Sequence, residues 1–183
     1  MDALDGVTFV PKVGGRPHLV HALDGRWQGL TTRDLTAAVC ELAAGMDTRG
    51  VDYVVGFPEG GLVPAFAFAQ VVDRPLILST RLRLERAPVI SFEEPHSPQG
   101  TSHYLYGLRP GDAVVIIEDE VTTGRTVINA VRALRAAGIR IGQVGVLMAV
   151  DNEPMWRRMA EEDIALHVRV RVPPGYRGAP TGS

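Results

Sequence analysis

A single α/β domain with a mostly parallel sheet flanked by helices is the fold that the sequence predicts. Short runs rich in β-branched residues alternate with runs of helical period, which indicates parallel strands joined by helical crossovers. The 183 residues match one domain of about 100–200 residues. Hydrophobic residues make up 45% of the chain, whereas glycine and proline contribute 20 and 13 residues, so we expect an ordered core.

The predicted helices begin and end at residue types that favour those positions. Thr31 or Thr32 caps the first helix, Pro64 is permitted in the first turn of the second, and Gly138 stops the third. In chain order, the predicted elements are helix 32–44, strand 51–55, helix 62–72, strand 76–79, strand 113–117, helix 126–137, strand 144–150, helix 154–160 and strand 166–172. Cys40, the one cysteine, has apolar neighbours, so we expect a core residue and no internal disulfide.

One long segment, 80–108, breaks the alternation of strands and helices. It contains Arg81, Arg83 and Arg86 together with several prolines, and it shows little sustained periodicity. Loops of this length inside a compact domain are usually functional or disordered, and the position between two core strands favours a mobile lid. We therefore expect one domain over 1–172 with a mobile loop at about 80–108, followed by a disordered tail over 173–183.

The charge and hydropathy patterns exclude two classes of partner. A formal net charge of -2 provides no broad basic surface for nucleic acid. The longest nearly apolar stretch, Leu62–Val72, is interrupted by Pro64 and Gln70 and is too short to span a bilayer. The first residues also lack a basic secretory leader. We expect a soluble, cytoplasmic protein that binds neither a membrane nor nucleic acid.

The segment after the strand predicted over 113–117 carries the strongest functional signal. Two adjacent carboxylates, Glu118 and Asp119, end an apolar strand, and a tight Thr-Thr-Gly turn then leads directly into a helix. Free N–H groups and the positive end of the helix dipole would converge there on a phosphate dianion. The residues of this phosphate loop are Glu120, Val121, Thr122, Thr123, Gly124, Arg125 and Thr126.

A sugar phosphate would explain why carboxylates stand beside a phosphate site. Its hydroxyl groups would donate hydrogen bonds to Glu118 and Asp119, while its phosphate binds one turn further along. The alternative is a helix-capping loop whose acidic residues lie near the positive end of the dipole and need no ligand. The complete string of apolar strand, acidic pair, Thr-Thr-Gly-x-Thr and helix favours the ligand-binding interpretation.

This string resembles the phosphoribosyl pyrophosphate (PRPP) motif of the type I phosphoribosyltransferases. The resemblance implies a Rossmann-like fold with a small N-terminal hood at about 1–30. It assigns the ribose hydroxyls to Glu118 and Asp119, and the 5′-phosphate to the phosphate loop. The order of the other segments is similar to orotate phosphoribosyltransferase, in which Arg81 matches the entrance to a mobile catalytic loop. A pyrophosphate loop is then expected at Phe57, Pro58, Glu59, Gly60 and Gly61.

Several positions differ from the orotate enzymes. The family places an arginine after an aspartate that follows a later strand, whereas this chain has Asn152 after Asp151. An asparagine there suits a neutral amide-bearing or purine-like ring, because it offers both a donor and an acceptor. The predicted lid contains no lysine, which leaves arginines such as Arg81 to stabilise departing pyrophosphate. His18 and His21 lie in the expected hood, where they either contact the base or are ordinary packing residues.

Two further features of the site leave alternatives open. The family often has lysine or arginine before the final glycine of the pyrophosphate loop, whereas this chain has Gly60, so pyrophosphate would depend more on backbone N–H groups, Mg²⁺ and the lid. A general base for the incoming nitrogen is the other feature, since histidine titrates near neutral pH. The candidates, which are otherwise solvated loop residues, are Glu93, Glu94, His96 and His103.

The resemblance implies a PRPP-dependent phosphoribosyltransferase that joins 5-phosphoribosyl to a nitrogen of a heteroaromatic nucleobase and releases pyrophosphate. Glu118, Asp119 and Arg81 are then the catalytic residues. Mg²⁺ is the implied cofactor, bound mainly by PRPP and reached by Asp119 through water. A homodimer is also implied. The alternatives are a non-catalytic regulatory protein that senses PRPP or a nucleotide, and a nucleotide-binding hydrolase.

Overall fold

The computed structural model describes residues 7–10, 18–23, 25, 29–95 and 101–176. Its centre is a five-stranded parallel sheet in the order β4-β3-β7-β8-β9. The strands are β3 Tyr53–Gly56, β4 Leu76–Leu78, β7 Ala113–Val121, β8 Arg140–Val150 and β9 Leu166–Val172. The predicted α/β fold with a mostly parallel sheet is confirmed.

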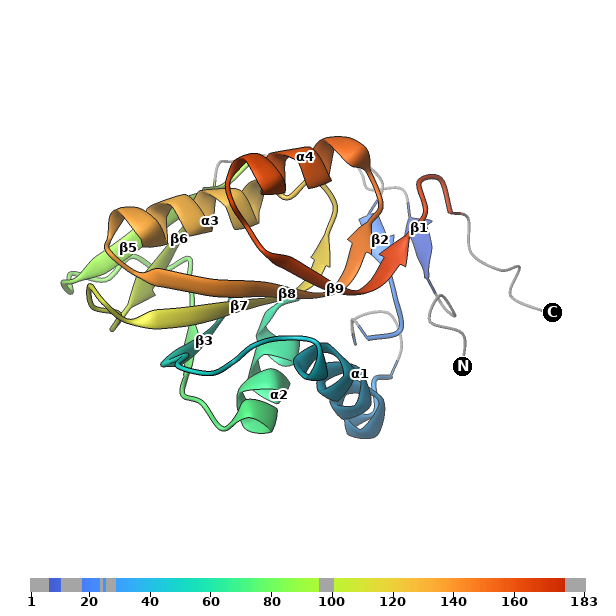
Figure 1. The fold of residues 1–183 in the computed structure, drawn as a ribbon, viewed down its shortest axis with the longest axis horizontal. Coiled ribbons are helices and arrows are strands. Elements are labelled where there is room, and N and C mark those ends of the chain that lie inside the picture. The colour runs from blue at the N-terminus through green and yellow to red at the C-terminus, as the bar shows by residue number, and fades with distance from the viewer. Residues whose placement is uncertain (1–6, 11–17, 24, 26–28, 96–100, 177–183) are drawn as a thin grey trace.

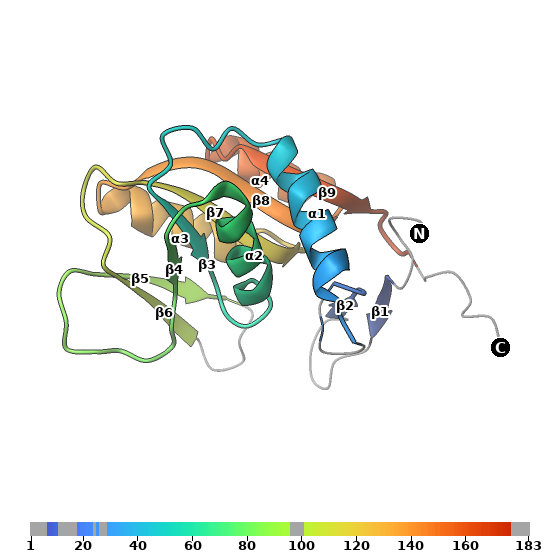
Figure 2. The ribbon, with the colours of Figure 1, turned by 90° about the horizontal axis from the view of Figure 1, so that it is seen from below.

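Helices cover both faces of this sheet. The helices are α1 Thr32–Ala44, α2 Leu62–Val72, α3 Arg125–Ala136 and α4 Glu153–Glu161. Figure 1 shows α1 and α2 on one face and α3 and α4 on the other, and Figure 2 shows the face covered by α1 and α2. Each face has its own apolar cluster, and β7 is buried between them, with Val114 and Ile116 completely inaccessible. A strand buried on both faces requires the continuous apolar run that the sequence shows at this position.

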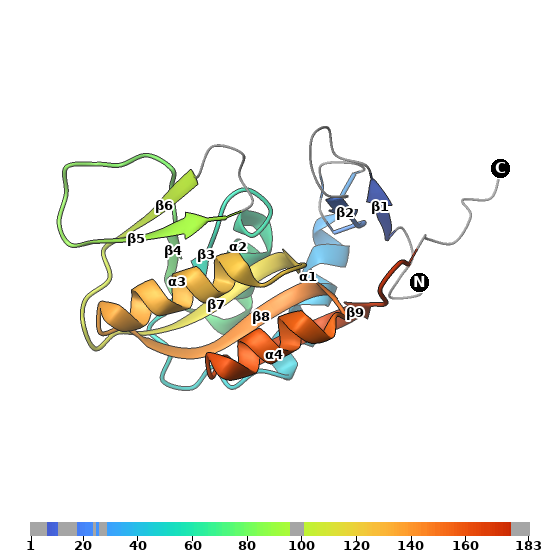
Figure 3. The same cartoon turned by 90° about the horizontal axis from the view of Figure 1, so that it is seen from above.

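Two antiparallel hairpins lie outside the central sheet. Strand β1 (Thr8–Val10) pairs with β2 (His18–Val20), and β5 (Val89–Glu94) pairs with β6 (Thr101–Tyr106). In Figure 3 the first hairpin lies near the end of β9, and the second lies beside α3. Ile90 in the second hairpin is buried in the cluster under α3. The segment predicted as a mobile loop therefore contains a packed hairpin, and its mobility stays a prediction.

The boundaries of the elements mostly follow local signals in the sequence. Helices α1 and α2 and strand β9 have the predicted bounds, and Thr31 caps α1 by accepting a hydrogen bond from the Asp34 N–H at 3.1 Å. The predicted end of the third strand at Ile117 is wrong. Strand β7 continues to Val121, because this extension pairs with β8. The acidic pair therefore belongs to the strand and is held by its ladder.

The prediction that Cys40 is a core residue is also wrong. Cys40 is exposed, because it follows the buried Val39 by one residue and is rotated about 100° away from the apolar face of α1. Beyond β9, the Tyr176 N–H donates to the Pro173 carbonyl at 3.1 Å and Tyr176 packs on the cluster under α1, while the disorder of the tail 173–183 stays a prediction. The rest of the predicted tail, 177–183, lies outside the described residues.

The described helices also bear on the membrane prediction. Over the described ranges, no helix has both the length and the apolar character that crossing a bilayer requires.

Candidate active site

The carboxyl ends of β3 and β7 bring the two predicted ligand loops together. The chain passes from β3 outward to β4 and then returns to β7 on the other side of β3, so the direction of the strand order reverses between β3 and β7. Open α/β sheets bind ligands beyond the carboxyl ends of their strands at such a switch point. Gly56 at the end of β3 pairs with Ile117 of β7. The predicted pyrophosphate loop therefore starts beside the acidic pair.

Two carboxylates of β7 lie directly against the pyrophosphate loop. A Cβ atom at Gly60 would be 1.7 Å from Asp119 Oδ2, and one at Gly61 would be 2.7 Å from Glu118 Oε1. A side chain at either position would collide with a carboxylate, so glycine is what permits this approach. The structure also explains why Gly60 stands where the family often has a lysine or arginine: the space is filled by Asp119.

The Glu118 carboxyl lies in a strongly unfavourable environment for its charge. Burial raises the pKa of Glu118 well above its usual range, and the neighbouring charges of Asp119 and Glu120 raise it further. A backbone hydrogen bond from Phe57 opposes this shift. Glu118 Oε1 is buried and has no hydrogen-bond partner among the described residues. A ligand that donates hydroxyl groups or brings positive charge would satisfy this oxygen.

The N-terminus of α3 opens beside the acidic pair. Gly124 has a left-handed φ of 73° and lets the chain turn from β7 into the helix. The Arg125 N–H is directed at Thr123 Oγ1 at 3.5 Å, and regular bonding begins with the Ile128 N–H and the Gly124 carbonyl at 2.9 Å. The other N–H groups of the first turn have no acceptor within the helix. This geometry fits the anion-binding role predicted for the phosphate loop.

Side chains of the next helix hold the phosphate loop. Asn152 is the N-cap of α4: its Oδ1 accepts from the Met155 N–H at 2.9 Å, and its Nδ2 donates to the Thr122 carbonyl at 2.8 Å. Arg158 Nη2 donates to the Thr123 carbonyl at 3.0 Å. The amide of Asn152 is thus engaged within the protein, and its contact with a base stays a prediction. Arg158 was not predicted, because nothing in the sequence links α4 to this loop.

Arg81 lies at the edge of the site between two carboxylates. Its guanidinium is 3.4 Å from Glu59 in the pyrophosphate loop and 3.4 Å from Glu94 in β5. The side chain is 46% exposed. Long, exposed pairs of this kind contribute little stability, so the guanidinium can exchange its partners for a ligand at low cost. The role of Arg81 at departing pyrophosphate stays a prediction.

His103, one candidate for the general base, is buried in a structural network. Its Nδ1 is 3.2 Å from Ser79 Oγ, and its Nε2 is 3.3 Å from Glu94 Oε2. Its ring stacks on Phe92 with 5.1 Å between centroids, and Phe92 packs in turn on Phe57 with 4.8 Å between centroids. These contacts join the β5–β6 hairpin to the pyrophosphate loop, so His103 helps to hold the two segments together.

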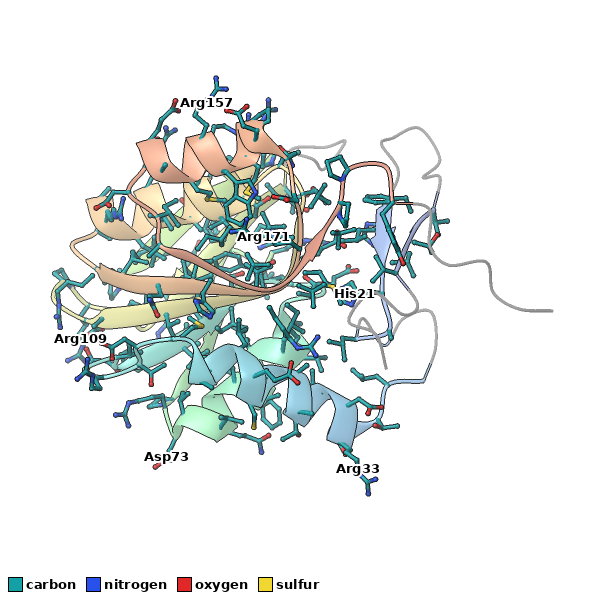
Figure 4. All side chains as sticks on the ribbon, turned by 45° about the vertical axis from the view of Figure 1, so that its right-hand side comes forward. His21, Arg33, Asp73, Arg109, Arg157 and Arg171 are labelled. Atoms are coloured by element: carbon teal, nitrogen blue, oxygen red, sulfur yellow. The ribbon has the colours of Figure 1, made fainter. Side chains whose placement is uncertain are left out.

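The hairpin β1–β2 lies over the carboxyl end of β7. His18 Nδ1 is 3.5 Å from Glu120 Oε1, and His21 is 1% exposed. Figure 4 shows His21 near the carboxyl end of the sheet, beside the hairpin. This is the place expected for a hood, and a contact of either histidine with a base stays a prediction. His96, another candidate for the general base, lies outside the described residues.

A separate cavity of about 370 Å³ lies at the amino ends of β3, β7 and β8, at the opposite edge of the sheet from these loops. Asp47 and Arg49 line it and form an ion pair at 2.7 Å. The Arg49 guanidinium, with the Arg49 backbone N–H, lowers the pKa of Asp47 to about 2. Asp47 and Arg49 of this cavity are therefore paired with each other, Arg140 donates to the Gly111 carbonyl, and the acidic pair and its loops lie elsewhere.

The fold and the site define a Rossmann-like α/β domain in which the N-terminus of a helix opens beside an acidic pair, whose Asp119 is buried. The phosphoribosyl transferase family model matches residues 8–178 of the chain. The chain therefore belongs to the phosphoribosyl transferase family.

Named relatives and solved structures agree with this family. An adenine phosphoribosyltransferase of Synechococcus sp. (strain JA-3-3Ab) is 29% identical over 66% of this chain and 76% of its own length. An orotate phosphoribosyltransferase of Pyrococcus abyssi is 32% identical over 62% of this chain, and the match spans 56% of that enzyme. The crystal structure of an APRTase from Giardia lamblia complexed with 9-deazaadenine superimposes with a TM-score of 0.71 at 18% identity, covering 91% of this chain and 93% of the other. The structural likeness shows a shared type I phosphoribosyltransferase fold.

Proposed function

We propose that this protein transfers the 5-phosphoribosyl group of PRPP to a ring nitrogen of a heteroaromatic nucleobase and releases pyrophosphate. The bond from ribose C1 to pyrophosphate oxygen breaks, the bond from C1 to nitrogen forms, and the ring nitrogen gives up its proton. Membership of the family and relatives named for adenine, orotate and hypoxanthine/guanine support this reaction. The observation that carries the proposal is the contact of Asp119 with Gly60, because it joins the groups proposed to hold ribose and pyrophosphate.

The proposed mechanism places a developing cation beside the acidic pair. As pyrophosphate leaves, the sugar becomes oxocarbenium-like, and preorganised negative charge stabilises it where water is excluded. Glu118 and Asp119 accept hydrogen bonds from the ribose hydroxyls and supply that charge. The 5′-phosphate is anchored at the N-terminus of α3 by the phosphate loop. Both ends of the sugar are then fixed while its C1 atom is transferred.

The departing pyrophosphate requires its own donors. In this proposal it binds to backbone N–H groups of the pyrophosphate loop and to Arg81, which exchanges Glu59 and Glu94 for phosphate oxygens. Arginine suits this role because its planar group can donate two parallel hydrogen bonds. The segment 80–88 and the β5–β6 hairpin would close over the reacting centre and keep water from C1.

Mg²⁺ is the cofactor that we propose for PRPP binding. The described residues include no group of three histidine, cysteine or acidic side chains arranged to hold a metal ion. Mg²⁺ does not require such a group, because this small hard ion can take most of its ligands from pyrophosphate, ribose hydroxyls and water. Asp119, which lies against the pyrophosphate loop, is the residue that would hold the hydrated ion. The metal would neutralise charge on the pyrophosphate.

We further propose a homodimer in the cytoplasm. Exposed apolar side chains support the dimer: Phe66 on α2 is 55% exposed, Val63 one turn earlier is 47% exposed, and Leu82 near Arg81 is 63% exposed. Apolar residues gathered on one helix face are typical of surfaces that become buried in an assembly. The single cysteine, which cannot form a disulfide within the chain, suits the reducing conditions of the cytoplasm.

The reaction is tested by measuring pyrophosphate release from PRPP with Mg²⁺, in the presence of adenine, hypoxanthine, guanine or orotate. Release that depends on one of these bases, with a nucleoside monophosphate detected by mass, is the expected result. Release without any base would instead identify a hydrolase. Binding of PRPP without any release would identify a sensor.

The role of Asp119 is tested by Asp119→Asn, which preserves shape and removes the charge. We expect turnover to fall about 100-fold or more, since the charge acts on the developing cation. The control is Asp73→Asn, at the exposed left-handed C-cap of α2, far from the site in Figure 4. Asparagine tolerates that conformation, so the control should keep full activity. Near-normal turnover of Asp119→Asn would remove the proposed ribose-binding role.

A further inference from the structure

The phosphate loop rests on α4 through three adjoining contacts. A Cβ atom at Gly124 would lie 2.3 Å from Met159 Cε, so the loop backbone packs directly on the helix. Next to this contact, Asn152 Nδ2 donates to the Thr122 carbonyl at 2.8 Å and Arg158 Nη2 donates to the Thr123 carbonyl at 3.0 Å. Two successive peptide groups of the loop are therefore held by side chains from one helix.

These two hydrogen bonds determine where the loop N–H groups point. The peptides that join residues 122 to 124 are not among the cis bonds of the chain, so each N–H points opposite to the carbonyl of the same peptide. The Thr122 and Thr123 carbonyls point toward α4. The N–H groups of Thr123 and Gly124 consequently point away from α4, to the side from which an anion would approach the N-terminus of α3.

We propose that Asn152 and Arg158 are positioning residues that preset these N–H groups for the 5′-phosphate of the substrate. This inference rests on the proposed function. Donors that already point at the ligand lose no freedom when it binds, which increases affinity for the phosphate end without any contact to it. Arg158 also brings a positive charge to the far side of the loop, which strengthens the polarisation of the Thr123–Gly124 peptide.

The surroundings of Arg158 indicate that the role of its guanidinium is the hydrogen bond to the Thr123 carbonyl. Arg158 is half-buried, and its Nε is enclosed with no hydrogen-bond partner among the described residues. Burial of an unpartnered donor is unfavourable, and a smaller or apolar side chain would avoid it. The neighbouring Arg157 provides the contrast: it is exposed, pairs with Glu153 on the same helix, and points away from the molecule in Figure 4.

The test compares two ligands that occupy opposite ends of the site. Isothermal titration calorimetry with ribose 5-phosphate reports on the phosphate loop, and titration with magnesium pyrophosphate reports on the pyrophosphate loop. For Asn152→Ser, which keeps an N-cap oxygen but loses the amide donor, we expect about a tenfold loss of affinity for ribose 5-phosphate. Arg158→Gln should lose at least as much. Affinity for pyrophosphate should stay within about twofold in both variants, as it should for both ligands in Arg157→Gln.

A conservative substitution separates positioning from simple folding effects. Arg158→Lys retains one donor and the charge, so it should recover part of the affinity for ribose 5-phosphate that Arg158→Gln loses. Unchanged ribose 5-phosphate affinity in Arg158→Gln and Asn152→Ser would overturn the inference. Equal losses for both ligands, accompanied by a lower melting temperature and no recovery with lysine, would also overturn it, because they indicate general damage. Failure of the unsubstituted protein to bind either ligand would instead refute the proposed function on which the inference rests.

Discussion

Adding one methyl group at Gly60 provides a direct test of how closely the acidic pair approaches the pyrophosphate loop. In Gly60→Ala the new Cβ atom would lie 1.7 Å from Asp119 Oδ2 and 2.3 Å from its Cγ. Ordinary van der Waals contact begins at 3.4 Å, so the loop and the carboxylate must separate by about 1.7 Å. The carboxylate cannot move freely, because Asp119 is 5% exposed and lies in a segment of β7 that pairs with β8.

The expected loss of activity follows from this displacement. A misplacement of about 1 Å in a catalytic group costs on the order of 100-fold in rate, so kcat/KM should fall by at least about 100-fold, or about 2.7 kcal/mol in transition-state free energy. Crowding a packed site also costs about 1–3 kcal/mol of stability. For a chain of this length, that corresponds to a fall in melting temperature of several degrees.

The assay is base-dependent pyrophosphate release, measured with the preferred base at saturating Mg²⁺, together with a thermal melt. Gly142→Ala is the matched control, since a Cβ atom there would lie 3.6 Å from the Val114 carbonyl oxygen and 3.8 Å from Val51, in ordinary contact. The control should keep both activity and melting temperature. If Gly60→Ala retained kcat/KM within about threefold of Gly142→Ala, Asp119 would not be held against the loop as the structure indicates.

Three further substitutions test other parts of the site and surface. Because the pKa of Glu118 is raised in the folded protein, stability should fall as the pH rises from the ordinary glutamate value toward the raised one; urea unfolding should show a flatter dependence for Glu118→Gln, and equal slopes would contradict this. Arg81→Ala should lower kcat about 10- to 100-fold while the Kd for PRPP changes about threefold or less, whereas a pure binding defect would argue against a role at the leaving group. Phe66→Glu should convert a dimer to a folded monomer in sedimentation velocity, and an unchanged mass would exclude this face of α2 from the interface.

The parts of the fold that the sequence predicts are those governed by local signals. Helix α1 has a threonine cap and an apolar stripe, and α2 is an apolar run that begins after two glycines and ends before Pro75. These signals lie within each segment, so the bounds of both helices agree with the structure. The helices that connect successive parallel strands can also be predicted, because parallel strands require a crossover connection.

The β5–β6 hairpin shows where local signals are insufficient. Ile90 and Phe92 alternate with exposed residues, a strand pattern, and they pair with Leu105 and His103 respectively. The prolines and the length of the segment indicated a loop, and the pairing depends on contacts between residues up to 17 positions apart, such as Val89 and Tyr106. Such pairings depend on the packing of the hairpin against α3, which a single strand pattern does not contain.

The site residues also fall into two groups: those in one local motif and those brought in by tertiary packing. Glu118, Asp119 and the phosphate loop form one continuous motif in the sequence, so they could be proposed as a site from the sequence alone. Arg158 follows Asn152 by six residues, or about 1.7 turns of α4, and its contact with Thr123 spans 35 positions. It depends on how α4 lies across the loop. The same contact explains why Asn152, the residue after Asp151, caps a helix and holds the loop.

The acidic pair and the phosphate loop act on different stages of the proposed reaction. Burial raises the pKa of Glu118, and repulsion from the charges of Asp119 and Glu120 raises it further, so a charged Glu118 is unfavourable in the ligand-free protein. A sugar that becomes cationic as pyrophosphate leaves turns that repulsion into attraction, and the gain grows as the charge develops. The charge of the 5′-phosphate does not change during transfer. Substitutions in the acidic pair should therefore lower kcat, whereas substitutions that loosen the phosphate loop, such as Arg158→Gln, should weaken ground-state binding and the transition state alike.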